Sequence, residues 1–182
     1  MPPINPNIIL SSLYPEGSLA REVLTGHSEA VADMALEILD RKSLPLDRDE
    51  VYTAAMLHDI GICFTNAPSI GCHGTEPYIR HGILGAALLR DRGVDEKYAR
   101  VAERHTGAGL TAAEIEHQGL PLPHVDLLPE TMLERLICYA DKFYSKSGSN
   151  KRKPLESVRR SMITHGPETL ARFEALHREF GI

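Results

Sequence analysis

The sequence is poor in cysteine, has no long run of apolar residues and has no excess of positive charge. A helix that spans a bilayer needs about 20 mostly apolar residues in a row, and no stretch of the chain approaches this. The three cysteines are too few, and odd in number, for the disulfide framework of a small secreted protein. No Lys or Arg precedes Arg21, so the basic region of a secretory signal is also missing. We therefore expect a cytoplasmic protein with reduced thiols and no membrane partner.

The charge balance argues against a protein that coats nucleic acid. The 20 Lys and Arg are outnumbered by 25 Asp and Glu, which gives a formal net charge of −5. There is thus no strong nucleic-acid signal, although a local basic patch remains possible. Hydrophobic residues make up 42% of the chain and charged residues 25%, enough for a folded core. A chain of 182 residues fits one domain, so we expect residues 1–182 to form a single domain. The sequence does not indicate the oligomeric state.

Helical patterns dominate the chain. In residues 27–41, apolar residues recur at helical spacing with Glu and Asp on the opposite face. No segment shows the sustained alternation of a half-buried strand, and residues 61–76 are expected to form a loop. The sequence therefore predicts an all-α bundle of six to eight helices. The expected helices are 27–41, 48–60, 77–92, 95–105, 111–118, 130–146, 154–165 and 167–180.

The histidines, nine in all, suggest a metal site. His58 and Asp59 are adjacent at the end of an apolar helix, where burying both groups costs free energy unless each has a partner. A metal ion is one such partner, and helical bundles build metal sites from side chains of several facing helices. Further candidate ligands occur in four other predicted helices, in the order His27, His81, His105 and Asp141.

This ordered set resembles the HD superfamily of metal-dependent phosphohydrolases. His58-Asp59 is followed by Ile60-Gly61, as in the HD-Ile-Gly variant of that superfamily. The resemblance covers roughly residues 20–146, and the helices of 154–180 are expected to pack on this core. His81 and His105 resemble the subgroup that holds two metal ions.

The resemblance implies a ligand set and a reaction. One ion would be held by His27, His58, Asp59 and Asp141, and a second by His81 and His105, with Asp59 bridging the two. Asp59, His81 and His105 would then be the catalytic residues. The cofactors would be one or two divalent ions of Mn, Fe, Co, Ni, Zn or Mg, since ligands without thiolate do not choose among them. Two ions about 3.5–4 Å apart can hold a hydroxide that attacks a phosphoryl group.

A basic segment after the last ligand suggests where the substrate binds. Residues 146–160 contain six Lys and Arg against one Glu. From this run we select Lys146, Lys151 and Arg152 as phosphate contacts. The expected partner is therefore a small phosphorylated substrate or nucleotide.

Several alternatives within this family remain open. The sequences around His81 and His105 look like those of HD-type hydrolases of diadenosine tetraphosphate, but the segment after Asp141 does not. The Gly-Tyr-Pro signature of the cyclic-di-guanylate phosphodiesterases is absent. Some HD proteins with the same ligand order are di-iron oxygenases, so this chemistry is a second hypothesis. A metal- or nucleotide-binding regulatory module without turnover is a third.

Overall fold

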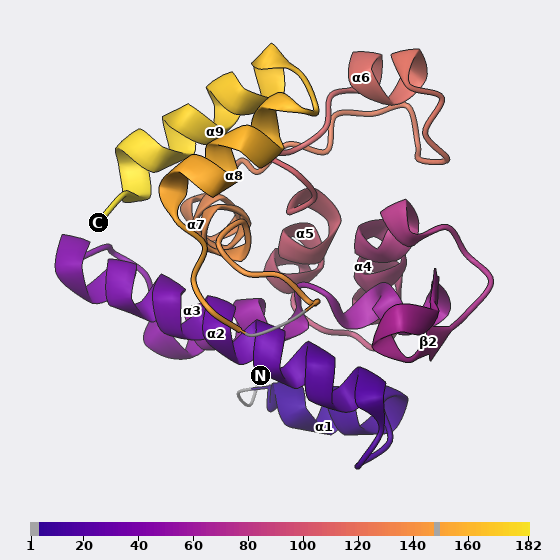
Figure 1. Ribbon diagram of the computed structural model, residues 1–182. Coiled ribbons are helices and arrows are strands. Elements are labelled where there is room, and N and C mark those ends of the chain that lie inside the picture. Colours follow the sequence, from indigo (N-terminus) through magenta and orange to yellow (C-terminus); the bar gives the residue numbers. More distant parts are fainter. Residues whose placement is uncertain (1–3, 148–149) are drawn as a thin grey trace.

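The computed structural model describes residues 4–147 and 150–182 and confirms an all-α fold. Within these ranges the chain forms nine α-helices (Figure 1), one more than the upper limit of the prediction. They are α1 (Pro6–Leu13), α2 (Leu19–Lys42), α3 (Arg48–Leu57), α4 (His81–Asp91), α5 (Glu96–Arg104), α6 (Ala112–His117), α7 (Met132–Asp141), α8 (Leu155–Ile163) and α9 (Pro167–Phe180). Among the described helices, none combines the length and the apolar character needed to cross a membrane.

The stretch expected to be a loop is shaped by short elements. The 3-10 helices η1 (Ile60–Phe64) and η2 (Pro68–Ile70) alternate with strands β1 (Asn66–Ala67) and β2 (Cys72–His73). The 3-10 helix η3 (Tyr78–Arg80) follows, at the start of the predicted helix 77–92. The two strands pair antiparallel over two residues each. A sheet this small leaves no periodic pattern in the sequence, which is why the prediction missed it.

Two helix boundaries differ from the prediction in ways that matter for the site. Helix α2 begins at Leu19, because the side chain of Ser18 accepts a hydrogen bond from the backbone N–H of Arg21 at 3.2 Å. His27 therefore lies in the middle of a long helix and not at its start. Helix α7 ends at Asp141 and does not reach residue 146, so the segment after Asp141 is free to turn back over the cluster.

The helices surround α7, which lies between α2 on one side and α8 and α9 on the other (Figure 1). Helix α2 packs on α3 and α7, α4 packs on α5, and α9 packs on both α7 and α8. The main core forms between these helices, and a smaller cluster of Ile115, Leu122 and Leu127 lies under α6. Burial of the apolar faces is the main force that holds the helices together.

A close contact between two glycines brings the His58-Asp59 turn against α4. A Cβ atom at Gly61 would lie 2.3 Å from both the carbonyl oxygen of His81 and the backbone nitrogen of Gly85. Only a residue without a side chain allows this approach. The contact fixes the spacing between Asp59 and His81, which are far apart in sequence.

Candidate metal centre

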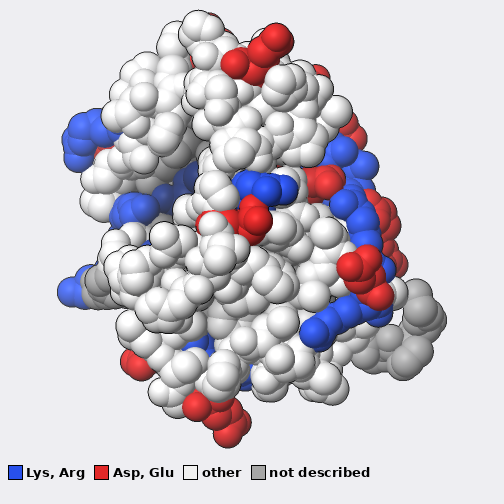
Figure 2. All heavy atoms as spheres, turned by 90° about the vertical axis from the view of Figure 1, so that its right-hand side faces the viewer, with Lys and Arg blue, Asp and Glu red and all other residues white. Residues whose placement is uncertain are grey.

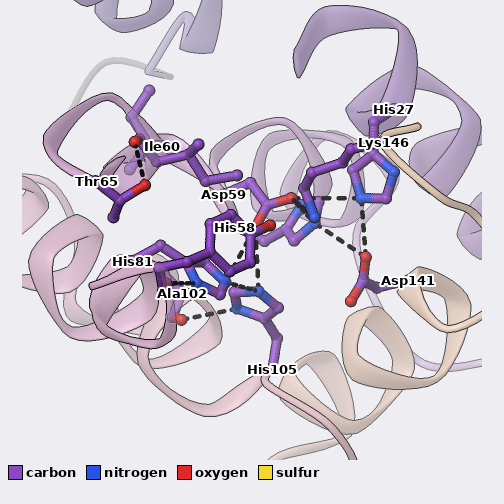
Figure 3. A network of polar contacts seen from close by, with 12 residues as sticks. His27, His58, Asp59, Ile60, Thr65, His81, Ala102, His105, Asp141 and Lys146 are labelled. Carbon is purple, nitrogen blue, oxygen red and sulfur yellow. Dashed lines mark hydrogen bonds and ion pairs between the residues drawn. The ribbon is translucent and has the colours of Figure 1, made fainter. Parts of the chain in front are cut away.

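The six predicted ligands come from five helical segments and converge in one buried cluster (Figure 3). His27 lies in α2, His58 and Asp59 directly follow α3, His81 opens α4, His105 follows α5, and Asp141 ends α7. Each of the six is at most 7% exposed. Burial of four imidazoles and two carboxylates in one volume is costly unless they bind a partner that satisfies them.

The cluster consists of two sets of candidate metal ligands, and Asp59 belongs to both. In the first set, His27 Nε2 lies 2.9 Å from Asp141 Oδ1 and 3.3 Å from Asp59 Oδ2. His58 Nε2 lies 3.1 Å from the same Asp59 oxygen. In the second set, Asp59 Oδ1 lies 3.4 Å from His81 Nε2 and 3.2 Å from His105 Nε2. Each carboxylate oxygen of Asp59 therefore faces a different set.

Backbone contacts fix the orientation of three of the imidazole rings. In each, Nδ1 contacts the carbonyl oxygen three residues earlier: His58 with Ala55 at 2.6 Å, His81 with Tyr78 at 2.7 Å and His105 with Ala102 at 2.8 Å. Ala55 and Ala102 lie in the last turns of α3 and α5, where carbonyls lack an intrahelical partner and can accept these bonds. The carbonyl of Tyr78 also accepts the backbone N–H of His81. With Nδ1 as the donor, Nε2 is the ring atom aimed into the cluster. This is the usual way in which a protein orients a metal-binding histidine.

The donor atoms of the cluster fit a metal ion. The Nε2 atoms of His81 and His105 lie 3.0 Å apart, although Nδ1 already carries the proton in each neutral ring. Asp59 Oδ1 and the Nδ1 atom of His27 lack a hydrogen-bond partner among the described residues. Lone pairs this close together are satisfied by a cation. Imidazole and carboxylate ligands suit divalent transition metals and do not select one of them.

The electrostatics of the cluster differ between the two sets. Burial lowers the pKa of His81 to about 3 and also lowers that of His105, so both rings are neutral at pH 7. For His58, burial alone would lower the pKa, but the carboxylates of Asp59 and Asp141 outweigh it and raise the pKa to about 9. Burial opposes the charge of the two carboxylates, yet the surrounding cations hold the pKa of each well below its usual value.

Two lysines reach the cluster from the segment that follows α7. Lys146 Nζ lies 2.7 Å from Asp59 Oδ2, and Lys142 Nζ lies 2.6 Å from Asp141 Oδ2. Lys142 also donates to the carbonyl of His105 at 2.9 Å. Burial would lower the pKa of Lys146, but its two carboxylate neighbours raise it above the usual value, so its ammonium stays charged.

A cavity of about 580 Å³ opens beside the cluster. Its walls come from residues 66–70, from the segment between Asp141 and Ser147, and from Lys153 and α8. Lys142, Lys146 and Lys153 all line it, whereas Asp141 is its one acidic lining residue among those described. Figure 2 views the molecule from the right-hand side of Figure 1 and shows Lys and Arg atoms recessed in a hollow on the left of the view. The cavity is therefore suited to an anionic ligand.

The structure separates the three residues predicted to contact phosphate. Lys146 lines the cavity, whereas Lys151 and Arg152 are not among its lining residues. Lys151 is exposed, and Arg152 lies 3.4 Å from Glu37 with its guanidinium over the ring of Phe143. Phosphate binding by these two residues therefore stays a prediction from the sequence, since neither residue lines the cavity.

Two cavity residues were not selected from the sequence. Lys153 was only one of six cations in the basic run, and His165 lies in a helix connection that resembled an ordinary surface segment. The local signal beside Lys153 is Pro154, which is the N-cap residue of α8 and restricts the backbone at this point. His165 left no local signal.

Comparison with known proteins agrees with this geometry. The HD domain family model matches residues 24–145. An uncharacterised protein of Methanocaldococcus jannaschii is 39% identical over 127 residues, which cover 68% of each chain. No solved structure matches the chain.

Two further relatives carry the name tRNA (cytidine(56)-2'-O)-methyltransferase. The protein of Picrophilus torridus is 33% identical over 160 residues, which cover 88% of this chain and 42% of the relative. The protein of Thermoplasma volcanium is 31% identical over 170 residues, which cover 93% of this chain and 44% of the relative. The chain thus spans less than half the length of these two relatives. By the extent of the family match and the buried His and Asp cluster, the chain belongs to the HD domain family.

Proposed function

We propose that the chain is a metal-dependent phosphohydrolase that acts on a small phosphate ester or nucleotide. The observation that carries the proposal is the combination of the two ligand sets that share Asp59 with a lysine-lined cavity beside them. His27, His58, Asp59 and Asp141 would hold one divalent ion, and Asp59, His81 and His105 a second. Two such ions lower the pKa of a water molecule toward neutrality and polarise a phosphoryl oxygen.

The residues of the chain supply binding, orientation and charge. Carbonyl contacts hold the rings of His58, His81 and His105 with Nε2 inward, so the ligands need no reorganisation when an ion binds. Asp59 would bridge the two positions because its oxygens face different sets. The ammonium of Lys146 lies at the boundary between cluster and cavity, where it would contact the phosphate and offset charge that develops during hydrolysis.

The di-iron oxygenase and the regulatory module remain alternatives with the same ligands. The three lysines in the cavity match the anionic substrate that a phosphohydrolase requires, and they argue against an oxygenase that acts on a neutral substrate. The methyltransferase activity named for two relatives is not part of the proposal. The chain spans less than half of those proteins, and its buried cluster offers metal ligands.

The test measures metal content first and turnover second. Elemental analysis of the untreated protein should find one to two divalent transition metals per chain. A panel of sugar phosphates, nucleoside 3′- and 5′-phosphates, cyclic nucleotides and tRNA with added Mn²⁺ should then show metal-stimulated hydrolysis. Lys146→Met should keep the metal and lose about 10²-fold or more in turnover, while Lys42→Met, a change at an exposed lysine at the end of α2, should retain both.

Each alternative gives a different result. Protein with less than one metal per chain that is inert on the whole panel overturns the proposal. Oxygen consumption by iron-loaded protein, with a mixed-valence signal in electron paramagnetic resonance, would identify an oxygenase. A nucleotide that binds and survives long incubation would identify the regulatory module.

A further inference from the structure

Among the residues that the structure describes, Lys153 is the cavity lysine without a carboxylate partner. Lys142 and Lys146 each lie within 2.7 Å of a carboxylate oxygen of the cluster. Within the described residues, Lys153 has no carboxylate within 4.0 Å, and its Nζ donates to the carbonyl of Tyr144 at 3.2 Å. A half-buried ammonium with a single neutral acceptor remains able to bind an anion.

The fold holds Lys153 in place. Its backbone N–H donates to the carbonyl of Phe143 at 2.8 Å, which ties it to the segment just after α7. Pro154 follows it as the N-cap residue of α8, so the chain direction is set on both sides. The side chain is therefore presented to the cavity by the backbone and is not a freely moving surface lysine.

Neighbouring groups on α8 add polar contacts to the same wall. Ser161 lies in α8 and His165 two residues after its end, and both line the cavity. A hydroxyl and an imidazole can each donate to a phosphate oxygen. The lysine, the hydroxyl and the imidazole line the same cavity and are not metal ligands, so they offer donors to a second anionic group.

Resting on the proposed function, we propose that Lys153, Ser161 and His165 form a second phosphate subsite and that the substrate carries two separate phosphate groups. One phosphate would lie at the metal centre beside Lys146, and the other against Lys153. The cavity of about 580 Å³ is of the size that binds a small metabolite or a single nucleotide. The substrate class is thus a bisphosphorylated sugar or nucleoside.

The experiment compares matched pairs of ligands that differ by one phosphate. Adenosine 3′,5′-bisphosphate is set against adenosine 5′-monophosphate, and fructose 1,6-bisphosphate against fructose 6-phosphate. In at least one pair, the wild type should show a KM about 10-fold lower for the bisphosphate, as expected for one charge-assisted contact. Lys153→Met should remove this preference by raising the KM of the bisphosphate more than that of the monophosphate, and Lys42→Met should behave as the wild type.

Binding measurements separate failure of the subsite from failure of the proposed function. Titration calorimetry with each ligand pair needs no turnover and should show the same preference in Kd and the same loss in Lys153→Met. Hydrolysis of monophosphates and bisphosphates at equal KM would uphold the proposed function and overturn the second subsite. Binding of a bisphosphate that depends on Lys153, without any hydrolysis, would uphold the second subsite and overturn the proposed function. Equal Kd values for both members of each pair, or no effect of Lys153→Met, overturn the inference.

Discussion

The Nε2 atoms of His81 and His105 lie 3.0 Å apart, while the Nδ1 of each ring contacts a backbone carbonyl. Two neutral imidazoles held in this way direct lone pairs at the same point. Burial keeps the pKa of both rings below the usual value, so protonation does not relieve the conflict at neutral pH. A cation bound between the two rings relieves this conflict between lone pairs.

His105→Ala should remove one metal ion per chain and leave the other. The second set would then consist only of His81 and one oxygen of Asp59, too few protein ligands for a stable site. Metal counted by mass spectrometry after gel filtration should fall from two equivalents to one. His73→Ala, at an exposed position in β2, is the control and should keep two. Two ions retained by His105→Ala would contradict the assignment.

Asp59→Ala should empty both positions together, because Asp59 is the one residue common to the two sets. Asp141→Ala removes a ligand from the first set alone and should leave the second ion bound. The same mass-spectrometric metal count compares the two variants. Loss of a single ion in Asp59→Ala would show that this carboxylate does not bridge.

Metal affinity should rise with pH up to about pH 9. Burial alone would lower the pKa of His58, but the nearby carboxylates raise it to about 9. Below that pH the ring binds a proton that a metal ion must displace, so acidification favours the proton and weakens metal binding. Calorimetry between pH 6.5 and 8, in buffers of different ionisation enthalpy, should detect the released proton and a roughly tenfold gain in affinity per pH unit. A metal affinity that stays flat or falls with rising pH would show that the metal ion does not displace a proton from His58.

Chemistry singles out His58 and Asp59 in the sequence, and the resemblance to the HD superfamily supplies the other four ligands. His58 and Asp59 are adjacent on an apolar face, and few partners other than a metal ion offset the free-energy cost of burying both. The all-α class was also predictable, since apolar spacing at the helical period recurs along most of the chain. These features depend on residue type and local order, which a sequence displays directly.

The walls of the cavity could not be predicted in the same way. Lys151, Arg152 and Lys153 are consecutive, yet only Lys153 lines the cavity. What separates them is the path of the segment after α7, set by the hydrogen bond from Lys153 to Phe143. The start of α2 was missed for a related reason, because the capping role of Ser18 lies outside the apolar periodicity. Tertiary contacts and caps decide such details.

Glu134→Ala should destabilise the fold by about 2–4 kcal/mol. Glu134 is buried in α7, where one oxygen accepts from Arg100 Nε at 2.7 Å and the other from the backbone N–H of Glu130 at 2.8 Å. Urea unfolding measures the loss. Glu96→Ala removes the exposed partner of Arg90 and should cost at most about 1 kcal/mol. Equal losses would show that burial of Glu134 does not strengthen its contacts.

The contribution of Glu134 should also depend on pH. Burial opposes its charge, but the hydrogen bonds from Arg100 and the backbone outweigh this and lower its pKa. A lowered pKa gives stability that is present above the pKa of the unfolded chain and lost as pH falls through that of the folded chain. The difference in unfolding free energy between wild type and Glu134→Ala should therefore shrink as the pH falls below about 4.

Gly61→Ala should cost about 3 kcal/mol and weaken the second metal position. The new Cβ would lie 2.3 Å from the carbonyl oxygen of His81 and from the backbone nitrogen of Gly85. Backbone atoms cannot rotate aside, so the turn that carries Asp59 must move away from α4. Gly93→Ala is the matched control, because its Cβ meets nothing within 4 Å and only its φ of +65° opposes the change, at about 1 kcal/mol. If Gly61→Ala bound both ions with unchanged affinity, the spacing between Asp59 and His81 would not depend on this contact. A selective loss of the second ion would show that the glycine contact sets the geometry of the shared ligand.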